Sequence, residues 1–185
     1  MKLKVRDRIL KVASERFYHQ GFNQTGINQI IAEADIAIGS LYKHFPSKHE
    51  LLVAYLKRQE LEWFSQFDMY IQGVTDPGEK VFRFIKYRIE HQAKSDFAGC
   101  PFLKIVAELG SSETDILQLV EDHKNRQRLL LSGFIKQARY DGPLDKKLLS
   151  EILFLMTEGA IAMSTTAKTT TALVNVLKFA KKTLS

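Results

Sequence analysis

Apolar residues recur at intervals of three or four positions along most of this 185-residue chain, the spacing that places them on one face of a helix. No stretch shows the strict alternation of apolar and polar residues that is typical of a half-buried strand. The pattern therefore predicts an all-α fold of about nine helices. Two short helices are expected between Thr25 and Phe45, and the others over residues 5–19, 47–72, 79–93, 101–110, 113–140, 146–164 and 170–184.

Residues that start or stop helices mark the boundaries between these segments. The run 76–78, Asp-Pro-Gly, interrupts the pattern after the first long helix. Ser47 and Glu50 have the spacing of a capping box, in which each side chain accepts a hydrogen bond from the backbone amide of the other residue. Further boundary signals are Gly21, Pro101, Ser112 and Gly142. The signals predict a small N-terminal domain, residues 1–47, and a larger helical domain, residues 48–185.

The two short helices have the sequence form of a helix-turn-helix. Their core positions are Ile27, Ile30, Ile31 and Ala34 in the first helix, and Leu41 and Phe45 in the second. Thr25 stands just upstream as a helix-start signal. Two short helices joined by a turn of three or four residues, the second with polar and aromatic side chains outward, are typical of a DNA-binding motif. The second helix is expected to enter the major groove.

This stretch resembles the N-terminal pattern of the TetR family of transcriptional regulators. The matching positions are Thr25, Ile30, Ala34, Ile36, Gly39, Leu41, Tyr42, His44, Phe45, Lys48 and Leu51. Asp35 departs from the pattern at the usual turn glycine, but Asp tolerates left-handed backbone angles better than most residues. Ala37 departs where a serine often caps the recognition helix, and a missing cap typically costs ~1 kcal/mol. The resemblance is specific over roughly the first third of the chain.

The resemblance implies that the motif contacts both the phosphates and the bases of an operator. Tyr42 and His44 face outward, where the resemblance implies phosphate contacts, and Lys48 is expected to add another at the start of the next helix. Lys43 is the best candidate to read a guanine. The predicted DNA-binding residues are Thr25, Asn28, Ile38, Gly39, Ser40, Tyr42, Lys43, His44 and Lys48.

The charge of the chain is concentrated at the same end. Residues 1–58 hold ten lysines or arginines against five acidic residues, whereas residues 59–185 hold 17 against 16. Phosphate neutralisation supplies most of the affinity for nucleic acids, so this excess fits DNA binding. The N-terminus lacks the apolar block of a signal peptide, and no run of about 18 uncharged apolar residues occurs. We therefore expect a cytoplasmic protein with no membrane span.

The last two predicted helices are too apolar to be solvated. The first of them, residues 146–164, is apolar around most of its circumference, and its Gly159 allows another helix to approach closely. Such helices must be covered on two sides. Two copies of the chain are therefore expected to pair them as a four-helix bundle about a two-fold axis. The predicted interface residues are Leu149, Ile152, Met156, Gly159, Ala160, Met163, Leu173, Val176, Leu177 and Ala180.

Aromatic residues of the larger domain are candidates for an effector cavity, although such a stripe is more often plain core. The candidates are Trp63, Phe64, Phe67, Phe84, Phe97, Cys100, Phe102 and Met156. Cys100 is the only cysteine and is interpreted as a small buried hydrophobe rather than a redox sensor. The five histidines lack metal-ligand spacing, and no catalytic motif occurs. We expect no metal, no cofactor and no enzymatic activity.

These observations predict a DNA-binding transcriptional regulator, a repressor whose homodimer leaves a palindromic operator when a small-molecule effector binds. The effector acts by favouring a conformer with the wrong spacing between recognition helices. The alternative is a helical interaction module whose basic N-terminus binds an acidic partner or a membrane surface. Salt-dependent, sequence-selective retention of DNA separates the two hypotheses.

Overall fold

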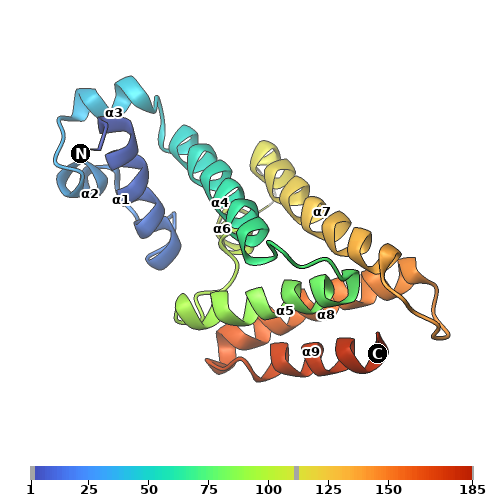
Figure 1. Ribbon diagram of the computed structural model, residues 1–185. Helices are drawn as coiled ribbons and strands as arrows, with labels where there is room; N and C mark the ends of the chain where they lie inside the picture. The colour runs from blue at the N-terminus through green and yellow to red at the C-terminus, as the bar shows by residue number, and fades with distance from the viewer. Residues whose placement is uncertain (1–2, 111–112, 185) are drawn as a thin grey trace. The chain divides into compact units, whose positions relative to one another are not determined.

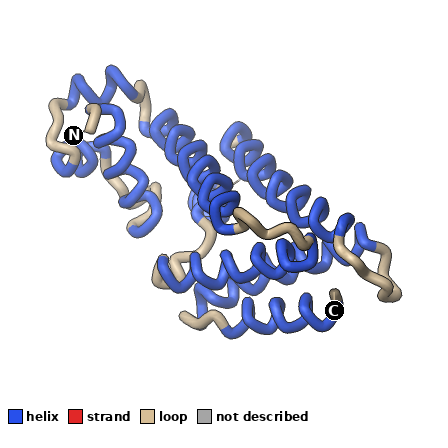
Figure 2. Tube along the Cα trace, in the orientation of Figure 1, coloured by secondary structure: helices blue, strands red, loops and turns tan. Residues whose placement is uncertain are grey.

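The computed structural model of the protein describes residues 3–110 and 113–184. Within these ranges the chain forms nine α-helices (Figure 1), and Figure 2 shows only helices and loops. The helices are α1 (Val5–His19), α2 (Ile27–Glu33), α3 (Ile38–His44), α4 (Lys48–Tyr70), α5 (Pro77–Lys94), α6 (Pro101–Leu109), α7 (Thr114–Gln137), α8 (Lys146–Ala167) and α9 (Thr171–Thr183). The predicted all-α fold is confirmed.

The described chain divides into two compact units. The N-terminal unit holds Met1–Glu62 and Pro101–Val120, and the C-terminal unit holds Trp63–Cys100 and Glu121–Ser185. Helix α6 therefore packs with the N-terminal helices although it follows α5 in the chain. Helices α4 and α7 each contribute one part to each unit. The predicted boundary after residue 47 separates a DNA-binding function from an effector-binding one. The two units are defined by packing, so they do not test this boundary, and it stays a prediction.

The core of the N-terminal unit lies between α1, α2 and α3, which pack against one another. Each helix contributes a fully buried residue: Ile9 from α1, Ile30 from α2 and Leu41 from α3. The ring of Phe17 meets that of Phe22 edge-on at 5.2 Å. Burial of each large apolar side chain contributes ~1.5–3 kcal/mol. Helices α2 and α3 have seven residues each, too few to be stable alone, so this shared core holds them.

Several helix ends follow the predicted signals. The Glu50 amide donates to Ser47 Oγ at 3.0 Å, which is one half of the predicted capping box at the start of α4. Gly21 follows α1 with φ +98°, a conformation that favours glycine at the end of a helix. Ser112, predicted to help cap the helix now labelled α7, lies outside the described residues.

The core of the C-terminal unit lies where α5, α8 and α9 run side by side (Figure 1). Phe84, Leu153 and Leu173, one from each helix, are fully buried there. By length and composition alone α8 is apolar enough to cross a membrane, a test that core helices of soluble proteins also pass. One face of α8 packs against α5 and α9, and the opposite face is exposed.

Candidate functional site

The turn between α2 and α3 fixes the direction of α3. Asp35 has φ +51°, the left-handed conformation expected for the residue that replaces the turn glycine. Its carbonyl oxygen accepts from Arg8 Nη2 at 3.3 Å, which ties the turn to α1. Ala37 precedes α3 and provides no side-chain cap. Leu41 and Phe45 are both buried, so packing rather than capping holds α3 in place.

The outer side of α3, here called the α3 surface, carries Ile38, Gly39, Ser40, Tyr42, Lys43 and His44. Tyr42 is 46% exposed and Ile38 is 55% exposed, which agrees with the outward orientation expected from the sequence. No atom lies within 4 Å of the position that a Cβ of Gly39 would take, so another molecule can approach the backbone there. Lys43 and His44 are also exposed, and Ser40 is half-buried. Asn28 is exposed on α2.

Thr25 does not lie on a DNA-binding surface. It is 0% exposed, and its hydroxyl donates to the Gly21 carbonyl oxygen at 2.6 Å. A side chain without exposed surface makes no contact with a phosphate, so its predicted DNA-binding role is corrected: Thr25 closes the turn between α1 and α2. It does not cap α2 either, since that helix begins at Ile27 after Gly26.

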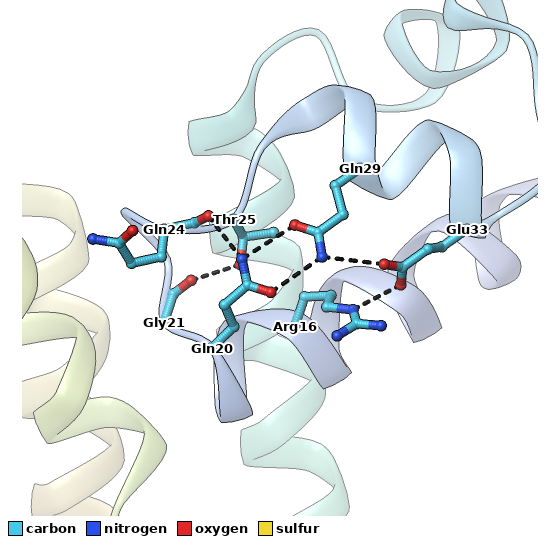
Figure 3. Close-up of polar contacts among 7 residues, drawn as sticks. All are labelled: Arg16, Gln20, Gly21, Gln24, Thr25, Gln29 and Glu33. Carbon is cyan, nitrogen blue, oxygen red and sulfur yellow. Dashed lines mark hydrogen bonds and ion pairs between the residues drawn. The ribbon is translucent and has the colours of Figure 1, made fainter.

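Figure 3 shows a polar network that joins α1 to α2 beside this turn. The side-chain amides of Gln20 and Gln29 donate to each other, at 3.2 and 3.1 Å. Gln29 also donates to Glu33 Oε1 at 3.1 Å, and Arg16 Nε donates to Glu33 Oε2 at 2.7 Å. The hydrogen bond from Arg16 lowers the pKa of the Glu33 carboxyl. The network fixes the rotation of α2 against α1 and thereby the direction of Asn28.

Lys48, predicted to contact a phosphate, already has a partner inside the protein. Its Nζ donates to the Phe22 carbonyl oxygen at 2.6 Å and lies 4.2 Å from the centre of the Phe22 ring. Burial lowers the pKa of its ammonium, and the carboxylate of Glu108 opposes that change. Lys48 therefore holds the segment after α1 against the start of α4, and its phosphate contact stays a prediction.

His49 lies beside two carboxylates near the start of α7. Its Nε2 is 2.7 Å from Asp115 Oδ2 and its Nδ1 is 3.4 Å from Glu113 Oε2. Candidate ligand atoms of the three side chains lie within 4.8 Å of one another. The hydrogen bond with His49 lowers the pKa of Asp115. Sequence spacing did not reveal this cluster, because its members lie far apart in the chain. The cluster links the start of α4 to the start of α7 within the N-terminal unit.

The helix-turn-helix segment matches a known family. Residues 9–55, which include the whole α3 surface, match the family model for bacterial regulatory proteins, tetR family. The HTH-type transcriptional regulator LmrA of Bacillus subtilis (strain 168) is 28% identical over 173 residues, which span 92% of each protein. The crystal structure of SCO4454, a TetR-family transcriptional regulator from Streptomyces coelicolor, superposes with a TM-score of 0.85 at 24% identity, covering 98% of this chain and 90% of that one.

Residues 9–55 thus belong to the TetR family of transcriptional regulators, and the chain as a whole has the fold of a solved member of that family. A further relative, the HTH-type transcriptional repressor KstR2 of Mycolicibacterium smegmatis, is 35% identical over 77 residues, 41% of this chain and 37% of that protein. The function predicted from the sequence, a DNA-binding transcriptional regulator, is thus confirmed. The alternative of a helical interaction module is not supported.

Four of the predicted effector residues form one aromatic cluster in the C-terminal unit. Trp63 stacks on Phe67 at 5.3 Å and meets Phe64 edge-on at 4.7 Å and Phe84 at 6.0 Å. All four are buried. The remaining predicted residues are Phe97, Cys100 and Met156 in the same unit, and Phe102 in the N-terminal unit. The cluster is packed aromatic core, and whether it also lines an effector site depends on the polar residues beside it.

Sequence reasoning missed the polar side chains that lie next to this cluster. They are Arg88 and Gln92 on α5, His123 and Gln127 on α7, and Glu158 on α8. The first four residues are buried, and Glu158 is mostly buried. Charged and amide side chains are rarely buried without a purpose, so this is the most unusual part of the C-terminal unit.

Two of these residues carry a signal in the sequence. Arg88 and Gln92 continue the apolar face of α5 that begins with Val81 and Ile85, at intervals of three or four residues. Ile89, the apolar residue that follows Arg88, is only half-buried. The signal is thus a polar residue at a position where the helical pattern predicts an apolar one. Such a residue marks a buried polar group.

His123 is held neutral at this site. Burial, together with the nearby charges of Lys124, Arg88 and Arg126, lowers its pKa to about 2. Its Nε2 lies 2.9 Å from Gln127 Nε2, so the amide donates to the ring nitrogen. Three cations acting on one neutral histidine indicate a positive electrostatic potential in this part of the C-terminal unit.

Only some of the predicted dimer-interface residues are exposed in the single chain and so available to a partner. Leu149, Ala160, Leu173, Val176 and Ala180 are buried within the single chain, so they pack its own core and offer no surface to a partner; their predicted role is corrected. Gly159 and Met163 lie on the exposed face of α8, and Ile152, Met156 and Leu177 are half-buried. Leu155 is 66% exposed on the same face and was not predicted.

Proposed function

We propose that this TetR-family chain is a cytoplasmic repressor that binds a palindromic operator as a homodimer and leaves it when a small-molecule effector binds. The observation that carries the proposal is the α3 surface, which projects from a helix held by buried Leu41 and Phe45. Two relatives, the regulator LmrA and the repressor KstR2, support the repressor role. Residues 1–47 then bind DNA, and residues 48–185 bind the effector and form the dimer.

The chemistry of the α3 surface suits the major groove. Lys43 is an exposed cation that reaches guanine O6 and N7, and the exposed Ile38 side chain suits contact with a thymine methyl group. Tyr42 and His44, exposed on the same helix, then hydrogen-bond phosphates of the operator. Asn28 on α2 is exposed and adds a further amide next to the same groove.

The dimer is proposed to form through the exposed face of α8. Leu155 and Met163, 66% and 59% exposed, lie two turns apart with Gly159 between them. Phe179 on α9 is also exposed. A row of large apolar side chains open to water, with a glycine that permits close helix approach, favours burial against a second copy. Pairing α8 and α9 of two copies gives a four-helix bundle with a two-fold axis.

Selection of binding sites from random duplex DNA tests the proposal directly. The expected result is a pseudo-palindromic site whose affinity falls as salt rises. Lys43→Ala should relax the preference at one base pair of each half-site by ~1–3 kcal/mol. The matched control is Lys178→Ala, an exposed lysine on α9, which should leave the selected site unchanged. Binding with no sequence preference, or equal effects of both variants, would contradict the proposed role of the α3 surface.

A further inference from the structure

Four helices of the C-terminal unit bring polar groups into contact with its aromatic cluster. We call this set the polar cluster; its members are Trp63 from α4, Arg88 and Gln92 from α5, Lys124 and Gln127 from α7, and Glu158 from α8. Several of its buried atoms have no hydrogen-bond partner among the described residues: Trp63 Nε1, Arg88 Nε and Nη2, Gln92 Oε1, Gln127 Oε1 and Glu158 Oε1. A buried polar group without a partner typically costs ~1–3 kcal/mol, so a cluster of them is typical of a site built for a ligand.

Arg88 is the central member of the polar cluster. It is only 7% exposed, and its guanidinium carbon lies 4.6 Å from the centre of the Trp63 ring and 5.3 Å from that of Phe84. Its unpartnered Nε and Nη2 form one edge of the guanidinium, the pair of parallel donors that a carboxylate accepts in a bidentate contact. The carboxylate oxygen Glu158 Oε1 is 3.6 Å from Nη2, beyond hydrogen-bond distance.

The charges of the polar cluster do not cancel. Glu158 Oε2 accepts from Lys124 Nζ, so its single negative charge is shared between Lys124 and Arg88. His123 beside them is neutral, because burial and the same cations lower its pKa. The site therefore holds a buried excess of positive charge, which disfavours a cationic ligand and favours an anionic one.

We propose that the polar cluster is the effector site, and that the effector is a small organic carboxylate with an apolar body. This proposal rests on the proposed function, which requires an effector. The carboxylate accepts from the Nε–Nη2 edge of Arg88 and from Trp63 Nε1. The apolar body lies among the rings of the aromatic cluster. Gln92 and Gln127 each keep an amide oxygen for a hydroxyl or N–H group elsewhere on the effector.

Trp63 provides the readout, because it is the only tryptophan of the chain. Three probes of one shape and different charge are titrated into the full-length protein: 3-phenylpropanoate, 3-phenylpropanamide and 3-phenylpropylamine. The emission of Trp63 should respond to the acid at concentrations on the order of tenfold or more below the amide, since charge-assisted hydrogen bonds are the strong ones. The amine should bind weakest. Equal binding of acid and amide, preference for the amine, or no response to any probe would overturn the proposal.

Substitutions within α5 distinguish the contribution of Arg88 from a general effect of changing this helix. Arg88→Gln should remove the preference for the acid over the amide, and Arg88→Lys, which keeps the charge but not the bidentate edge, should restore part of it. Arg83→Gln is the matched control, because Arg83 lies on the exposed side of α5 in an ion pair with Glu79. Helix content and the unfolding midpoint report whether each variant folds. The comparison of acid and amide in the unchanged protein decides the proposal even when Arg88→Gln does not fold.

Failure of this proposal is distinguishable from failure of the proposed function. Retention of operator DNA is measured without any probe and then with the acid added. Selective retention that the acid abolishes supports the ligand class and the release step together. Selective retention with no acid bound at Trp63 overturns the ligand class alone. Absence of selective retention contradicts the DNA-binding role, while the response of Trp63 still reports on the polar cluster.

Discussion

Replacing Lys48 with methionine tests whether this residue stabilises the fold or contacts DNA. Its ammonium donates to the Phe22 carbonyl oxygen at 2.6 Å and lies 4.2 Å from the Phe22 ring centre. A hydrogen bond from a charged group contributes ~1.5–3 kcal/mol, and a partly exposed cation over a ring adds ~0.5–1 kcal/mol. Methionine keeps much of the apolar stem but removes the charge and the donor. We therefore expect Lys48→Met to lower the free energy of unfolding by about 2 kcal/mol.

Urea unfolding followed by circular dichroism measures this change. With a slope of ~1–3 kcal/mol per molar urea, the expected shift of the midpoint is roughly 1 M. Lys57→Met is the matched control, since Lys57 is an exposed lysine of the same helix, and it should change stability by less than about 0.5 kcal/mol. Equal stability of Lys48→Met and the unchanged protein would show that the contact with Phe22 contributes nothing.

The salt dependence of operator binding tests whether Lys48 also contacts a DNA phosphate. A lysine that neutralises one phosphate contributes about one unit to the slope of affinity against salt. If the ammonium stays on the Phe22 carbonyl oxygen in the complex, Lys48→Met leaves this slope unchanged under conditions where the variant is folded. A slope that falls by about one unit per half-site would establish the predicted phosphate contact.

Three further outcomes are expected. Thr25→Val removes the hydroxyl that satisfies the buried Gly21 carbonyl and should cost ~1–3 kcal/mol in thermal or urea unfolding. Leu155→Glu combined with Met163→Glu should convert the dimer to monomer in analytical ultracentrifugation with little loss of helix, and a persistent dimer would place the interface elsewhere. Burial lowers the pKa of His91 to about 4 and that of His123 to about 2. Because the unfolded chain binds more protons below its ordinary histidine pKa of ~6.5, stability should be full above that pH and fall towards pH ~4, a loss that His91→Leu should reduce.

The helices and the helix-turn-helix were predictable because each depends on residues close together in the chain. The period of Ile30, Leu41 and their neighbours identifies the buried faces, and the left-handed conformation of Asp35 follows from its place between two short helices. The role of Thr25 was not predictable in the same way. A threonine before a helix suggests a cap, whereas its hydroxyl in fact bonds backward to Gly21, a choice that depends on how α1 and α2 pack.

Contacts between segments far apart in the chain could not be predicted from the sequence. Lys104 of α6 donates to the carbonyl oxygen of Tyr18, and Glu108 accepts from the Asn23 backbone amide at 2.8 Å. These bonds attach α6 to the segment around the α1–α2 turn, more than eighty residues earlier. Periodicity gives the buried face of a helix but not the identity of the surface that covers it. The same limit explains why the last two helices, both strongly apolar, were assigned too many interface residues.

The contacts of the polar cluster can supply the expected change in operator affinity on effector binding. An effector lowers operator affinity only by the difference in its own affinity for the two conformers of the protein. A hundredfold release requires about 2.7 kcal/mol, since each tenfold change is ~1.4 kcal/mol. A charge-assisted hydrogen bond contributes ~1.5–3 kcal/mol, so a carboxylate that meets Arg88 well in one conformer and poorly in the other supplies nearly all of it. Arg88 lies on α5, wholly within the C-terminal unit, while Trp63 lies on α4, the helix that starts at Lys48 in the N-terminal unit. A ligand that contacts both residues therefore acts on a helix whose first part, up to Glu62, packs in the N-terminal unit.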